Sequence, residues 1–168
     1  MYYETGQQMK KQLGQVELWL DATRAYADTK KVAPDLFAGF RLAPDQFPFL
    51  RQVQVTCDTA KLGLARLTGT TAPTHADTEQ TLEELRARVR SVIAFIDTLT
   101  PADFEGAAAR EVTQPRWEGK VMTGADYFRE HAIPNFYFHL TTAYAILRHN
   151  GVPLGKRDYL GALTMRAP

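Results

Sequence analysis

The sequence predicts an all-α four-helix bundle made by a single domain over residues 1–168. Four long segments repeat apolar residues at intervals of three and four, the spacing of a helix that buries one face. Loops with proline or glycine separate these segments. The sequence has no internal repeat of fixed length, so it does not resemble a repeat protein. A chain of this size buries roughly two-thirds of the surface of its unfolded form, which is enough for one core.

Composition and charge argue against two classes of partner. Net charge is +1, with 45% hydrophobic and 23% charged residues, and neither half is a basic arm, so we expect no nucleic-acid binding. No apolar run approaches the ~20 residues of a membrane span, and the start MYYETGQQMKK lacks the apolar core of a signal peptide. A single cysteine, Cys57, excludes an internal disulfide and favours a cytoplasmic location.

The spacing of apolar residues predicts the first two helices. The first is expected over 5–28, on a stripe formed by Met9, Leu13, Val16 and Leu20. The second is expected from Asp45, a suitable N-cap, to Gly69. Its stripe is the most regular in the chain: Leu50, Val53, Cys57, Ala60, Leu64 and Leu67. Beside that stripe runs a small or polar row: Gln52, Thr56, Thr59 and Gly63.

A third helix and a short extended segment follow. The helix is expected to start at Asp77, with a glutamine three residues later completing a capping box, and to end before Pro101. Its charged residues are interpreted as a solvated face: Glu83, Glu84, Arg86, Arg88 and Arg90. Residues 110–122 are expected to form a small two-stranded hairpin or an ordered loop, with Val112 and Val121 facing inward.

The last helix, expected over 126–150 with Thr123 as its cap, is the most informative stretch. Roughly opposite its solvent face it carries polar groups: Asn135, His139 and Thr142, with His131 one turn before Asn135 in the same row. An amphipathic helix packs by its apolar face, so this helix is expected to aim imidazole and amide groups inward. If the polar row of the second helix also faces the interior, it forms the opposite wall.

Several chemistry-bearing residues have a simple structural interpretation. Buried imidazoles need partners, so His139 fits a core histidine bonded to Gln52, Thr56 or Asn135 as well as a functional group. The remaining candidates are interpreted structurally: Cys57 as a small core residue, His75 as a surface residue, His149 as a partner of the helix end, Asp58 and Lys61 as a surface pair, and Phe138 and Tyr144 as core or dimer contacts.

Two blocks of the chain resemble a known family. The segments RLAPDQFPFLRQVQVTCDTAK and NFYFHLTTAYAILRHNGVPLGKRDYLGAL look like an uncharacterised branch of the DinB/YfiT-like superfamily, named only as a domain of unknown function. The resemblance covers most of the chain and implies a four-helix bundle of DinB topology, usually a homodimer. It also implies a kinship with metalloenzymes, some of them thiol-dependent transferases. These bind a divalent metal through one histidine on the second helix and a His-x-x-x-His pair on the fourth.

The family's metal ligands carry over only in part. The second histidine of the pair falls on His139, the first falls on Asn135, and the second-helix histidine falls near Gln52. Amides bind zinc or nickel weakly. His131 adds a further candidate ligand beside His139, although helical rise separates the two by about 12 Å. Pro134 offers a kink between them because it removes a backbone hydrogen bond.

Two hypotheses of function remain open. The first is a DinB-like enzyme in which His139, assisted by Asn135 and Gln52, acts as a general base or as a ligand of a divalent metal on a small molecule. The second is a non-catalytic bundle, either a homodimeric scaffold or a small-molecule-binding protein that has lost the metal site. An open cleft ending on His139 favours the first, and a sealed interior favours the second.

Overall fold

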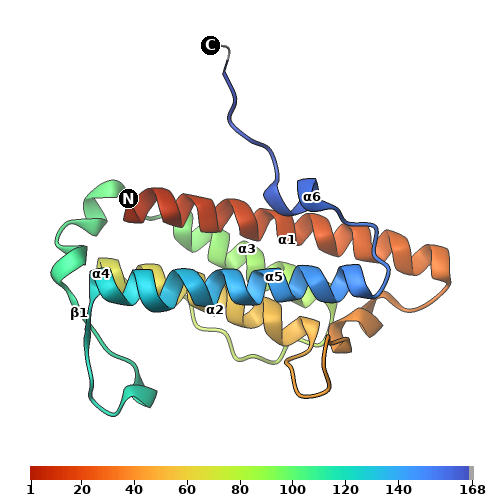
Figure 1. The fold of residues 1–168 in the computed structure, drawn as a ribbon, viewed down its shortest axis with the longest axis horizontal. Coiled ribbons are helices and arrows are strands. Elements are labelled where there is room, and N and C mark those ends of the chain that lie inside the picture. Colours follow the sequence, from red (N-terminus) through yellow and green to blue (C-terminus); the bar gives the residue numbers. More distant parts are fainter. Residues whose placement is uncertain (167–168) are drawn as a thin grey trace.

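The structure, a computed structural model, describes residues 1–166 and confirms the predicted four-helix bundle with a small hairpin before the last helix (Figure 1). The long helices lie side by side along the longest axis of the molecule. The elements in chain order are α1 (Tyr2–Lys30), η1 (Pro34–Gly39), α2 (Phe49–Thr68), α3 (Leu82–Asp97), η2 (Pro101–Phe104), η3 (Ala107–Ala109), β1 (Glu111–Val112), η4 (Pro115–Trp117), β2 (Met122–Thr123), α4 (Gly124–Tyr127), the π-helical turn η5 (Phe128–Ala132), α5 (Ile133–His149) and α6 (Lys156–Leu160).

The core forms where the apolar stripes of the helices meet. α2 packs against both α5 and α3, and α1 packs against α3. The regular stripe of α2 is fully buried from Val53 to Leu67, and its first residue, Leu50, is half-buried. Full burial of a leucine- or valine-sized side chain contributes about 1.5–3 kcal/mol. In the part of the chain that the structure describes, no helix is both long and apolar enough to cross a bilayer.

Two helix starts differ from the sequence expectation. α2 begins at Phe49 rather than near Asp45, because the Phe49 N–H donates to the Phe40 carbonyl and the preceding loop keeps an irregular path. α3 begins at Leu82 rather than at Asp77. Its capping box is made by Thr81 and Glu84, each accepting from the other's backbone N–H.

The last helix is interrupted one turn before its proline. Thr123 caps it as expected, its Oγ1 accepting from the Asp126 N–H. The backbone then runs through the π-helical turn η5 and continues as α5, which contains Pro134 near its start. Proline cannot donate to the carbonyl four residues back, so a wider turn accommodates the missing bond. η5 carries His131 and therefore sets its direction relative to α5.

The hairpin and the tail lie at the edges of the bundle. β1 and β2 pair antiparallel, with Glu111 opposite Thr123 and Val112 opposite Met122. Val112 is buried, but Val121 is 54% exposed, so its expected inward orientation was wrong. α6 packs on α1, where the Trp19 indole donates to the Asp158 carbonyl. Residues 162–166 are exposed and lead away from the bundle (Figure 1).

Buried charge joins α2 to α3 and corrects the interpretation of the α3 surface. Arg86 and Arg88 were expected on the solvated face, but both are buried, and the Arg88 side chain is 1% exposed. The Arg88 guanidinium donates to Asp77 at 2.6 Å, to Glu79 at 2.9 Å and to Asp58 at 2.7 Å. Two of these carboxylates lie on the segment before α3, so tertiary pairing outweighs the solvent preference of arginine.

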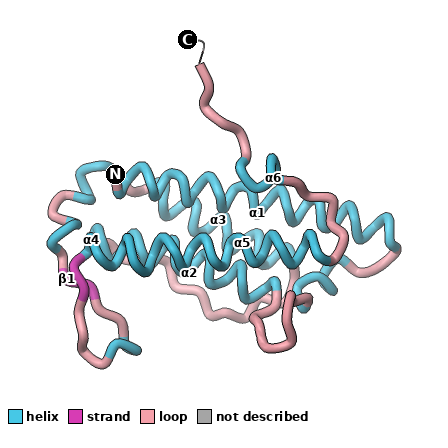
Figure 2. The backbone as a smooth tube through the Cα atoms, in the orientation of Figure 1, coloured by secondary structure: helices cyan, strands magenta, loops and turns pink. Residues whose placement is uncertain are grey.

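The same cluster holds the long loop between α2 and α3, which Figure 2 shows as a segment without helix. Lys61, expected on the surface, is 4% exposed; it contacts Asp58 at 3.0 Å and His75 Nδ1 at 2.6 Å. His75 is half-buried rather than a surface residue. Asp77 also accepts from Arg51 at 2.6 Å. Burial alone would raise the pKa of Asp77, but hydrogen bonds from the two arginines lower it overall.

Replacement of Arg88 by methionine should destabilise the fold strongly, because it leaves three carboxylates without their shared partner. We expect the free energy of unfolding, measured by urea denaturation at pH 7, to fall by about 3–5 kcal/mol. The control is Arg90→Met, which removes a solvent-exposed pair with Glu17 and should cost less than about 1 kcal/mol. Equal effects of the two substitutions would contradict a structural role for the cluster.

Candidate functional site

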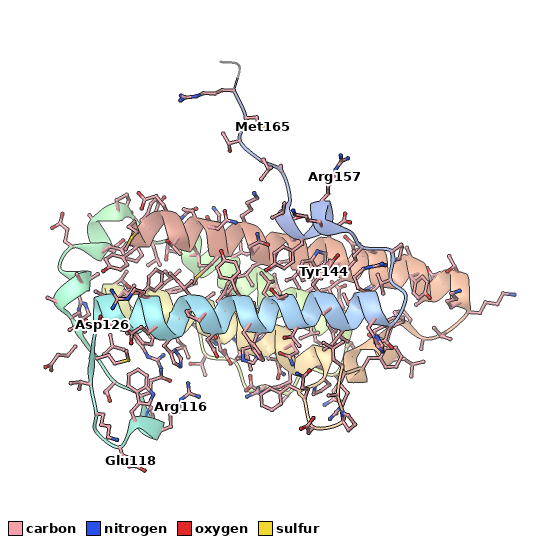
Figure 3. The ribbon with its side chains drawn as sticks, in the orientation of Figure 1. Arg116, Glu118, Asp126, Tyr144, Arg157 and Met165 are labelled. Carbon is pink, nitrogen blue, oxygen red and sulfur yellow. The ribbon has the colours of Figure 1, made fainter. Side chains whose placement is uncertain are left out.

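A cavity of about 320 Å³ lies between α2 and the α4–α5 segment. α2 and α5 run in opposite directions (Figure 1). Arg116, which Figure 3 labels in the segment between the two strands, also lines the cavity. The lining residues are Phe47, Arg51, Val55, Asp58, Thr59, Leu62, Arg66, Gln114, Arg116, Tyr127, His131, Asn135 and His139. A volume of this size suits a small organic molecule.

His139 is held in one orientation by α2. Its Nδ1 lies 2.7 Å from Gln52 Oε1, and the amide nitrogen of Gln52 donates to the Phe47 carbonyl at 3.0 Å. A carbonyl only accepts, so Gln52 must present its oxygen to the ring. The ring therefore carries its proton on Nδ1. In the neutral imidazole Nε2 is then an acceptor, and it receives no hydrogen bond from any residue within 1–166.

Asn135, one turn before His139, is fixed by the same logic. The Thr59 hydroxyl donates to the Val55 carbonyl at 2.7 Å, so it can only accept from Asn135 Nδ2, also at 2.7 Å. The amide oxygen of Asn135 is left as an acceptor on a residue that lines the cavity. Of the small and polar row of α2, Gln52 therefore bonds His139 and Thr59 bonds Asn135, but only Thr59 lines the cavity.

His131 lines the cavity at its other end, beside the hairpin loop. Its ring stacks on Tyr127, with 5.5 Å between the ring centroids, and meets the edge of Trp117. Its Nε2 lies 2.8 Å from Arg116 Nη2. A guanidinium only donates, so Nε2 accepts and the neutral ring carries its proton on Nδ1. That Nδ1 is buried and has no partner within the described residues.

The residues present do not fit the three-histidine metal site that the resemblance to DinB-like metalloenzymes implies. His139 Nε2 is a competent donor, but the family's other two positions hold the amides of Asn135 and Gln52, which are bonded to Thr59 and to His139 itself. Nε2 of His131, the other expected ligand, is engaged by a positively charged guanidinium. Within residues 1–166 no three histidine, cysteine or acidic side chains are grouped as a metal requires.

Positive charge dominates the cavity. Arg51, Arg66 and Arg116 all line it, whereas Asp58, its single carboxylate among residues 1–166, already contacts Arg88 and Lys61. Burial and then the charge of Arg51 lower the pKa of His139. Burial, then Arg116 and Arg66, lower the pKa of His131. Both rings are therefore held neutral near pH 7.

Two other nucleophile or ligand candidates lie outside the cavity lining. Cys57 is fully buried in the α2 stripe, and burial raises the pKa of its thiol to about 12, so it is not a nucleophile near neutral pH. His149 is exposed near the end of α5. Phe138, expected among core or dimer contacts, is 58% exposed beside His139.

Sequence reasoning missed the arginines of the cavity and Gln114. Arg51, Val55, Leu62 and Arg66 recur at near-helical spacing on one face of α2, a signal that was available beside the stricter apolar stripe. Gln114 and Arg116 come from the hairpin region, and nothing in their local sequence predicts that this region packs over the cavity.

Comparison with known proteins gives a family and a solved relative. The model of the family described as "Domain of unknown function (DUF1993)" matches residues 1–160. The crystal structure of a DinB family member protein from Shewanella denitrificans is similar over 99% of this chain and 95% of that chain, with 53% sequence identity and a TM-score of 0.95. No curated protein matches the chain.

The pKa of His139 should depend on the positive charge of Arg51. In proton NMR titrations we expect the pKa of His139 to lie below 6.5 and to rise in Arg51→Met without exceeding that value, because burial remains. A pKa depressed by folding also means that protons bind on unfolding. The contribution of His139 to the free energy of unfolding is therefore at its maximum above pH about 6.5 and decreases as the pH falls. The control is Arg24→Met, at an exposed position of α1, which should leave the pKa of His139 unchanged. An unchanged pKa in Arg51→Met would contradict the proposed effect of the Arg51 charge on His139.

Proposed function

The chain belongs to the DUF1993 family of DinB-like domains, and we propose that it binds a small molecule in the cavity between α2 and α5, with His139 as hydrogen-bond and proton acceptor. The observation that carries this proposal is the orientation of one ring. Gln52 holds His139 Nδ1, which leaves Nε2 as a free acceptor on a residue that lines an open cavity.

The chemistry of the site supports a general base. A neutral imidazole of lowered pKa accepts a proton from a bound hydroxyl, amine or water, and its protonated form is stabilised when Nδ1–H stays on an amide oxygen. Asn135 Oδ1, one turn away, orients the same donor group. Gln52 bonds the ring and does not line the cavity, so it is a positioning residue, whereas Asn135 and His139 line the cavity.

The metal-dependent form of this function has less support. Asn135 and Gln52 replace two of the family's histidines, and the arginines in the cavity oppose a cation. The remaining alternative is a homodimeric scaffold. It is favoured by three exposed apolar residues on or beside the cavity face, Phe47, Leu62 and Phe138. A scaffold needs no ligand beside His139, so ligand binding separates the two.

A fragment screen tests the proposal. Ligand-observed NMR with small hydroxyl- and amide-bearing compounds should find binders whose contacts map to the cavity. His139→Leu removes the acceptor and should weaken these compounds about tenfold, the loss of one hydrogen bond worth roughly 1.4 kcal/mol. His149→Leu, on the same helix outside the cavity, should bind them like the unmodified protein. Absence of binders in the cavity, or equal binding by His139→Leu, would reject the proposal.

A further inference from the structure

We propose that the end of the cavity formed by Arg66, Arg116 and Gln114 binds the anionic group, carboxylate or phosphate, of an elongated organic ligand. The inference rests on the proposed function in that both use the same cavity, but it depends on different residues. It names the class of ligand, which nothing in the family description assigns.

Two arginines at this end carry charge that the protein does not neutralise. Arg66 Nη1 donates to the Tyr127 hydroxyl at 2.9 Å, and Arg116 Nη2 donates to His131 at 2.8 Å. Both partners are neutral. Within residues 1–166 neither guanidinium has a carboxylate within 4.0 Å, in contrast to Arg51, which pairs with Asp77. Each guanidinium has five N–H donors in a planar fork, and this geometry matches a carboxylate or phosphate.

An unpartnered donor lies in the same lining. Gln114 is 9% exposed, and its Nε2 is buried without a hydrogen-bond partner among residues 1–166. Buried donors are normally paired, and Gln114 is one of the residues that line the cavity, so a small shift of its side chain would let a ligand supply the missing acceptor. The surplus of donors at this end is met by a group that only accepts, which is the property of an anion.

No acidic side chain of the lining supplies that acceptor. Asp58 is the carboxylate in the cavity wall, and its Oδ1 already lies 2.7 Å from Arg88 and 3.0 Å from Lys61. It is therefore committed to the cluster between α2 and α3. Burial is the largest cause of the lowered pKa of His131, and the positive charges of Arg116 and then Arg66 lower it further.

The rest of the cavity defines the remainder of the ligand. On α2, Leu62 is an apolar lining residue between Arg66 and Thr59, the partner of Asn135, and Val55 is a second one between Thr59 and Gln52, the partner of His139. Thr59, which bonds Asn135, is seven residues before Arg66 on α2, about 10 Å by helical rise. A matching ligand has an anion at one end, an apolar body and a hydroxyl or N–H donor about 10 Å away.

Isothermal titration with three probes tests the inference: 4-(4-hydroxyphenyl)butanoate, its neutral amide, and inorganic phosphate. The acid carries a phenol and a carboxylate at opposite ends. We expect it to bind at least tenfold more tightly than the amide, with an affinity that falls as salt concentration rises. NMR should show that the acid raises the pKa of His131. If phosphate binds as tightly as the acid, the proposal of an elongated ligand is wrong, and the arginine end of the cavity is a site for a free inorganic anion.

Variants identify the residues responsible. Arg116→Met, at an exposed loop position, and Arg66→Met should each reduce the preference for acid over amide at least fivefold. Arg129→Met, whose partners Asp126 and Glu130 lie outside the cavity lining, should preserve it. Failure of the unmodified protein to bind the acid, or a preference that survives in both variants, would overturn the inference.

His139→Leu separates this inference from the proposed function. If the inference and the proposed function both hold, His139→Leu weakens acid and amide alike and leaves their ratio unchanged. If the ratio depends on Arg66 and Arg116 while His139→Leu changes neither affinity, the anion site stands and the role of His139 fails. If His139→Leu weakens both probes and the arginines leave their ratio unchanged, the anion site fails and the role of His139 stands.

Discussion

The polar contact between α2 and α5 is the constraint on which the site depends. Two helices that otherwise pack through hydrocarbon side chains are joined by hydrogen bonds from His139 to Gln52 and from Asn135 to Thr59. Buried polar groups are normally paired, so these two bonds favour the register in which Gln52 meets His139 and Thr59 meets Asn135. The register fixes the proton of the imidazole on Nδ1. It therefore also decides which polar atoms are left for a ligand.

Arginine plays two roles in this bundle, and its partners distinguish them. Arg88 is enclosed by three carboxylates and joins α3 to α2 and to the loop between them. Arg66 and Arg116 have only neutral partners and line the cavity. Asp58 lies between the two groups and is engaged by the first. The buried charge of Arg88 is therefore neutralised within the protein, whereas Arg66 and Arg116 have no carboxylate partner among residues 1–166.

Periodicity was enough to predict the bundle, because stripes such as the one containing Leu64 can be buried only by neighbouring helices. It also predicted the burial of His139, whereas Asn135 is half-buried and bonded to Thr59. It failed where long-range partners decide: Asp77 pairs with Arg88 instead of capping α3, and burial of that arginine depends on carboxylates from other elements. Arg116 reaches the cavity from a loop, whose path no local pattern encodes.

The tautomer of His139 tests the central claim most directly. A long-range ¹H–¹⁵N correlation spectrum of ¹⁵N-histidine-labelled protein at pH 7.5 distinguishes the two neutral forms and the charged form. The account predicts a neutral ring with its proton on Nδ1 and an unprotonated Nε2. A ring protonated on Nε2 alone, or on both nitrogens, would contradict it, because no acceptor would then be available on His139 in the cavity.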